Sequence, residues 1–135
     1  MPPASVVSLR NVHKSVHEGR GSRRVLAGVD LDVAPGEAVA VLGRSGSGKS
    51  TLLNLIAGID DVDEGSVRTC EVDVVQADER QRARLRSERL GFVFQAFHLL
   101  PTLTVAENIA LPLELAGVAR SVAEPRVREL LARIG

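Results

Sequence analysis

Residues 43–50 read Gly-Arg-Ser-Gly-Ser-Gly-Lys-Ser, and this stretch decides the fold of the chain. The apolar run at residues 38–42 stands directly before it and has the character of a strand that is buried on both faces. After it, apolar residues recur at helical spacing from Leu52 to Ile56, and Gly58 is well placed to end a helix. The pattern therefore predicts a strand, a glycine loop and a helix in direct succession.

A loop of this composition is suited to hold phosphate groups. Backbone N–H groups that converge at a helix N-terminus bind anions, and glycines let the backbone turn and approach without a Cβ in the way. We expect Lys49 to reach the β- and γ-phosphates and the Ser50 hydroxyl to ligate Mg²⁺, while Thr51 adds a contact to the α-phosphate. The predicted nucleotide-binding residues of the loop are Gly43, Arg44, Ser45, Gly46, Ser47, Gly48, Lys49, Ser50 and Thr51. The sequence thus predicts that the chain binds a nucleoside triphosphate, namely ATP with Mg²⁺.

The bulk composition excludes several other classes of protein. Hydrophobic residues make up 44% and charged residues 25% of the 135 positions, which is the balance of a soluble globular domain. Basic and acidic residues are equal at 17 each, and this argues against a chain that coats nucleic acid or an anionic membrane. Cys70 has no partner for a disulfide, and no apolar run approaches the roughly 18 residues that span a bilayer. We therefore expect a cytoplasmic protein.

The remaining segments predict short strands and helices. Strands are predicted at residues 6–9, 29–33, 72–75 and 90–94 and around Val67, and residues 13–24 are predicted to be a polar loop. The densely charged residues 76–89 are predicted to be helical. Two capping boxes, each a Ser or Thr followed by Glu three residues later, begin at Thr104 and Ser121, and the second precedes a single apolar stripe.

Several motifs together resemble one family of nucleotide-binding proteins. They are Leu9-Arg-Asn-Val-His-Lys14, Pro35-Gly36-Glu37, the glycine loop, Gly91-Phe-Val-Phe-Gln95, and Pro101-Thr-Leu-Thr-Val-Ala-Glu107-Asn108 with Pro112. In this order they resemble, essentially end to end, the N-terminal portion of an ABC-type ATPase. The closest likeness is to the exporter subgroup that includes LolD and MacB.

The resemblance implies a fold and two further site residues. The fold would be α/β, a P-loop NTPase core with N-terminal β-strands and the start of an ABC helical subdomain, incomplete in this chain. The core would occupy residues 1–94 and the Q-loop with the helical subdomain residues 95–135. Gln95 matches the glutamine that positions the attacking water and Mg²⁺. Val16 stands where the family carries an aromatic residue that stacks on adenine, and that aromatic is absent here.

The resemblance also implies partners and a function. The intact protein would be the ATP-binding subunit of a transporter that exports lipoproteins, peptides or drugs. It would pair with a second ATP-binding subunit and a transmembrane permease, at the inner face of the cell membrane and without nucleic acid.

Family features that belong after residue 95 are absent. These are the signature motif, the Walker B strand and its catalytic Glu, so we expect a truncated chain that binds Mg-ATP weakly and hydrolyses it inefficiently. Without the Walker B strand, residues 38–42 should present an exposed apolar edge.

The alternatives to a transporter subunit are a non-hydrolytic nucleotide-binding module, a decayed gene product or a soluble ABC-type protein that acts on DNA or ribosomes. The stretch from Pro101 to Pro112 favours a transporter over the last of these.

Overall fold

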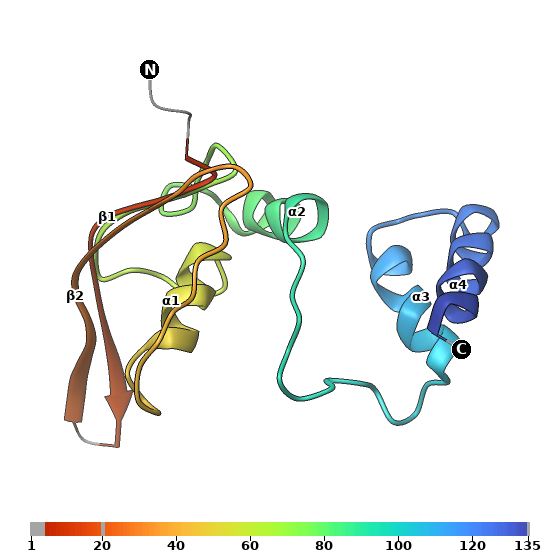
Figure 1. Ribbon diagram of the computed structural model, residues 1–135, viewed down its shortest axis with the longest axis horizontal. Helices are drawn as coiled ribbons and strands as arrows, with labels where there is room; N and C mark the ends of the chain where they lie inside the picture. The colour runs from red at the N-terminus through yellow and green to blue at the C-terminus, as the bar shows by residue number, and fades with distance from the viewer. Residues whose placement is uncertain (1–4, 20, 135) are drawn as a thin grey trace. The chain divides into compact units, whose positions relative to one another are not determined.

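The computed structural model describes residues 5–19 and 21–134, which fall into two compact units that divide between Leu90 and Gly91 (Figure 1). The first unit combines a four-stranded sheet with two helices, and the second contains two helices. The α/β class predicted from the sequence is confirmed. The sheet that the structure describes is antiparallel throughout.

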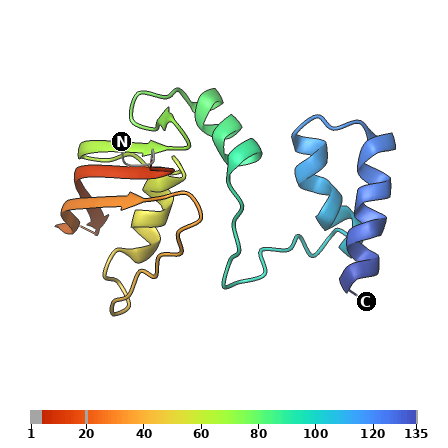
Figure 2. The ribbon, with the colours of Figure 1, turned by 45° about the horizontal axis from the view of Figure 1, so that its top comes forward.

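The sheet of the first unit has the strand order β2-β1-β3-β4 (Figure 2). Its strands are β1 (Val7–Glu18), β2 (Gly21–Val33), β3 (Glu64–Thr69) and β4 (Val72–Asp73). The prediction of a polar loop at residues 13–24 is wrong, because most of this segment forms the paired ends of β1 and β2. A two-stranded ribbon that extends beyond the core can be solvated on both faces, so no apolar alternation marks it in the sequence.

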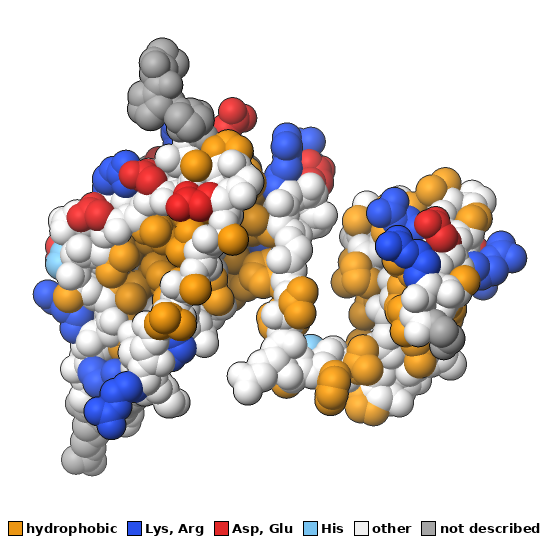
Figure 3. Space-filling model, viewed as in Figure 1, with side chains coloured by type: hydrophobic (Ala, Val, Ile, Leu, Met, Phe, Trp, Pro, Cys, Tyr) orange, Lys and Arg blue, Asp and Glu red, His pale blue; other side chains and the backbone are white. Residues whose placement is uncertain are grey.

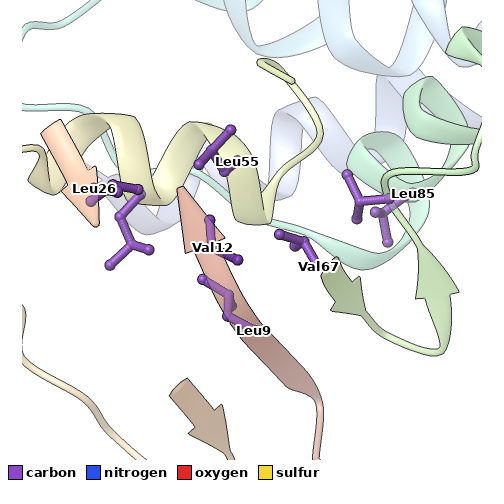
Figure 4. Packing of buried hydrophobic residues seen from close by; sticks show 8 residues of the cluster. Leu9, Val12, Leu26, Leu55, Val67 and Leu85 are labelled. Carbon is purple, nitrogen blue, oxygen red and sulfur yellow. The ribbon is translucent and has the colours of Figure 1, made fainter. Parts of the chain in front are cut away.

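Helix α1 (Lys49–Ile56) packs its apolar face on this sheet. Figure 4 shows Leu55 of the helix beside Leu9 and Val12 of β1 and Val67 of β3, and each of these side chains is at most 1% exposed. Leu26 of β2 and Leu85 of α2 (Glu79–Arg89) belong to the same cluster, together with Leu52 and Val74. The core is therefore aliphatic, and it fixes α1 against the sheet.

The predicted strands at residues 38–42 and 90–94 are wrong, because neither segment is a strand in the structure. An apolar run becomes a strand only where a neighbour completes its hydrogen-bond ladder, and the described sheet supplies none here. Residues 38–42 are exposed instead, with Leu42 at 89%, and Val93 of the second segment is fully exposed. The apolar residues 38–42 are exposed, as expected, but they form no sheet edge because the segment is not a strand. Figure 3 shows hydrophobic side chains on the surface of both units.

The second unit is a pair of helices, α3 (Val105–Leu115) and α4 (Arg120–Ile134), which pack on each other. The predicted capping box at Thr104 is confirmed, since the Thr104 hydroxyl accepts from the backbone N–H of Glu107, whose carboxylate accepts from the backbone N–H of Thr104. The box predicted at Ser121 is wrong, because α4 begins at Arg120. The carbonyl of Ala119 already accepts from the N–H of Ala123, so Ser121 lies within the first turn. None of the helices among the described residues is long and apolar enough to span a membrane.

Candidate functional site

The glycine loop ends at the N-terminus of α1, and the packing of that helix holds it in place. Leu52 and Leu55 are buried against the sheet, so the start of the helix is anchored to the core. Gly48 is the N-cap residue, no side chain caps the helix, and the first turn contains no acidic residue. The amides of a first helical turn have no carbonyl partner within their own helix, and they carry the positive end of the helix dipole. This end of α1 is therefore open to an anion.

Close packing explains why residue 48 is glycine. Its φ is +94°, and a Cβ at this position would lie 2.9 Å from the Val25 carbonyl oxygen and 3.1 Å from Cδ2 of Leu26. The loop therefore rests directly on β2. A Cβ at Gly43 would lie 2.5 Å from the Ser47 hydroxyl oxygen, so the loop is also closed upon itself at this point.

The ammonium group of Lys49 lies against the loop. Its Nζ donates to the carbonyl oxygens of Gly43 at 2.9 Å and Arg44 at 2.8 Å, and the Ser47 hydroxyl oxygen lies 3.5 Å away. These are bonds to neutral acceptors on an exposed loop, and a phosphate oxygen that reached the ammonium would form a stronger, charge-assisted bond. The cation is thus held where the loop and the helix N-terminus meet.

A second cation reaches the loop from the sheet. Nη1 of Arg23 donates to the Gly46 carbonyl oxygen at 3.1 Å, and Arg23 lies opposite Val16 in the β1–β2 ladder. Sequence reasoning missed Arg23, because it lies in the segment that was predicted to be a loop. Only the pairing of β1 with β2, which fixes the position of the arginine, could have indicated it.

The chain's other lysine, Lys14, has a structural role. Its Nζ donates to the Asp60 carboxylate at 2.8 Å and to the Asp61 carbonyl, and its side chain is 13% exposed. Burial raises the pKa of Asp60, but hydrogen bonds from Lys14 and the Asp61 backbone, together with the lysine charge, leave that pKa below its ordinary value. Lys14 therefore ties β1 to the segment after α1, and Lys49 is the lysine of the loop.

The remaining predicted site residues are distributed over both units. Ser50 is exposed and Thr51 half-buried in the first turn of α1, and Val16 is half-buried on β1. Gln95 is exposed and belongs to the second unit, in a segment without helix or strand. The first unit thus contains the loop, the start of α1 and Val16, whose ladder partner Arg23 contacts the loop.

The donor chemistry of the loop fits magnesium only in company with a phosphate. Among the described residues, no group of three or more His, Cys, Asp and Glu side chains could hold a metal ion. Mg²⁺ is commonly bound through one or two protein oxygens, several waters and the phosphates of a substrate. The Ser50 hydroxyl can supply one such oxygen at the place where the loop would hold the phosphates.

Comparison with protein families gives a match to the ABC transporter model over residues 26–135. An uncharacterized ABC transporter ATP-binding protein of Mycobacterium tuberculosis is 48% identical, over 96% of this chain and 52% of its own length. The lipoprotein-releasing system ATP-binding protein LolD of Pseudomonas syringae is 46% identical, over 100% of this chain and 60% of its own length. The chain thus spans between about half and three-fifths of the length of these curated relatives.

Solved structures give the same result. The ATP-binding cassette MJ0796, solved as a dimer in a post-hydrolysis state bound to ADP and Pi, superposes with a TM-score of 0.81 and 37% sequence identity. The match covers 93% of this chain and 56% of the cassette.

Proposed function

Because the chain belongs to the ABC transporter family, we propose that it is part of an ATP-binding subunit and holds Mg-ATP on residues 43–51. The observation that carries the proposal is the position of the Lys49 ammonium, on the carbonyls of a glycine loop that leads into a helix without a side-chain cap. A cation, first-turn amides without a carbonyl partner in their own helix, and glycines that let the backbone approach closely are the features that bind phosphates.

Each part of the loop would have a separate task. The amides of the loop and of the first turn of α1 would surround the phosphates, with Lys49 at the β- and γ-phosphates. Ser50 would hold Mg²⁺ together with a phosphate oxygen, and Thr51 would contact the α-phosphate. Val16 would lie on the side of the base, and Gln95 would position the attacking water and Mg²⁺ in the intact protein.

In the intact protein, ATP binding and hydrolysis would drive export through a transmembrane permease. Likeness to the ATP-binding protein of a lipoprotein-releasing system supports an export role with a lipoprotein, peptide or drug as substrate. A cassette solved as a dimer supports a second ATP-binding subunit as a partner. The protein would then work at the cytoplasmic face of the cell membrane, bound to the permease.

The chain by itself would bind Mg-ATP weakly and hydrolyse it inefficiently. Phosphoryl transfer needs a positioned water and charge stabilisation on both the attacking and the leaving oxygens. The loop offers the stabilising groups in Lys49 and Ser50, whereas Gln95 is the one candidate that we assign to the water. Binding would be weak because Val16 offers no aromatic ring on which the base could stack. Stacking of a base on an aromatic ring is worth about 1–3 kcal/mol.

Calorimetric titration with ATP, in the presence and absence of Mg²⁺, tests the proposal. We expect Lys49→Ala to weaken ATP binding by about 10- to 100-fold, as for the loss of a charge-assisted contact. Ser50→Ala should remove most of the Mg²⁺ dependence. Arg126→Ala, which removes the same charge from the exposed face of α4, is the matched control and should leave the affinity unchanged.

Two results would contradict the proposal. Equal affinities for the wild-type chain, Lys49→Ala and Arg126→Ala would show that ATP does not bind to this loop. Phosphate release that depends on Mg²⁺ and disappears in Lys49→Ala would show that the chain turns over ATP, against the predicted inefficiency.

A further inference from the structure

The contact between Arg23 and the phosphate loop joins two parts of the chain that lie 23 positions apart. Arg23 is on β2, and its guanidinium donates to the carbonyl oxygen of Gly46, near the middle of the loop. Gly46 has a φ of +77°, and no atom lies within 4 Å of the place where its Cβ would be. Nothing packs against the Cβ position of this glycine, and the hydrogen bond from Arg23 ties its carbonyl oxygen to β2.

A loop that binds anions through its N–H groups must keep its carbonyl oxygens away from the anion. A carbonyl oxygen that turned inward would repel phosphate, and a residue at positive φ without packing contacts can rotate easily. A donor that is bonded to the carbonyl oxygen fixes the orientation of the peptide, as Arg23 does at Gly46. The guanidinium suits this task, since it is permanently charged and carries several N–H donors in a rigid plane.

From this geometry we infer that Arg23 is a positioning residue of the phosphate loop, which it holds ready for a triphosphate through the Gly46 carbonyl. The inference rests on the proposed function of residues 43–51 and adds a residue that the loop sequence does not contain. Because Arg23 acts through the backbone of Gly46, we expect it to change the affinity for the phosphate groups and not the affinity for the base.

The neighbouring arginine provides a matched control. Arg24 carries the same charge one residue further along β2, and successive side chains of a strand point to opposite faces. The ladder places Arg24 opposite Ser15, whereas Arg23 lies opposite Val16. A long-range effect of charge should be similar for the two positions, and an effect through the Gly46 carbonyl should be specific to Arg23.

The test measures the affinity of the full chain for ATP and for inorganic triphosphate in four variants. We expect Arg23→Ala to lower the affinity for ATP and the affinity for triphosphate equally, by about 3- to 10-fold. This is the effect of losing one hydrogen bond of ordinary net strength. Arg23→Lys keeps a charged donor and should restore most of the affinity, and Arg23→Gln should fall between the two. Arg24→Ala should remain within about twofold of the wild-type chain.

Amide resonances of the ligand-free chain provide a second measurement. In Arg23→Ala the resonances of Gly46 and Ser47 should shift while those of the core strands stay in place, and the circular dichroism spectrum should remain that of the wild-type chain. Unchanged resonances of Gly46 and Ser47 would overturn the inference.

Other outcomes separate this inference from the proposed function. Equal losses of affinity in Arg23→Ala and Arg24→Ala would overturn the positioning role. A loss of affinity for ATP without a loss for triphosphate would also overturn it, because Arg23 would then act on the base. A wild-type chain that binds neither ligand, with Lys49→Ala behaving identically, would overturn the proposed function. The ligand-free resonances would still decide whether Arg23 positions the loop.

Discussion

Replacement of Gly48 by alanine tests how the phosphate loop is built. The residue has a φ of +94°, and an added Cβ would meet the Val25 carbonyl oxygen at 2.9 Å and Cδ2 of Leu26 at 3.1 Å. A non-glycine residue at positive φ costs about 1–2 kcal/mol, and overpacking against fixed neighbours costs about 1–3 kcal/mol more. We therefore expect Gly48→Ala to lower the free energy of unfolding by about 2–5 kcal/mol, and to weaken ATP binding as the loop moves away from β2.

Urea unfolding followed by circular dichroism measures this loss, and Gly36→Ala is its matched control. Gly36 has a φ of +78°, but no atom lies within 4 Å of its Cβ position, so its substitution carries the backbone cost alone. The difference between the two variants isolates the close approach of the loop to β2. Equal losses in the two variants would refute the packing argument.

Three further predictions concern the contacts that support the two units. Thr69→Val should lower the free energy of unfolding by about 1–3 kcal/mol in urea titrations, because the fully buried Thr69 hydroxyl donates to the Ile56 carbonyl at 2.7 Å and that acceptor would lose its partner. Thr104→Ala should cost about 1 kcal/mol in the same assay as the cap of α3 is lost, whereas Ser121→Ala, inside α4, should cost clearly less. Hydrogen bonds from the Thr104 hydroxyl and backbone lower the pKa of Glu107, so its contribution to stability is complete above the ordinary value of 4.5 and is lost as the pH falls through the lowered one. Unfolding curves between pH 6 and pH 3 should show this loss in the wild-type chain and not in Glu107→Gln; parallel pH profiles for the two chains would contradict it.

Local patterns in the sequence predicted the elements whose stability comes from neighbouring residues. The glycine loop, helix α1 and the capping box at Thr104 each depend on residues within a few positions, so their sequence patterns were sufficient. The capping box of Asp78 and Gln81 at the start of α2 was not predicted, although the same kind of pattern was present.

Elements that depend on distant partners could not be predicted in the same way. Residues 38–42 have the composition of a buried strand, but a strand also needs a hydrogen-bonded neighbour, which composition does not reveal. The extension of β1 and β2 through residues 13–24 is the opposite case, where pairing makes strands of polar residues. Arg23 was missed for the same reason, because its contact with Gly46 depends on the register of β1 and β2.

Amide resonances followed during a titration with Mg-ATP test the central claim most directly. If the loop binds the triphosphate, the largest shifts will fall on residues 43–51, and Lys49→Ala will abolish them at the same ATP concentration. Shifts confined to other residues, or equal shifts in Lys49→Ala, would contradict the claim that this loop holds the nucleotide.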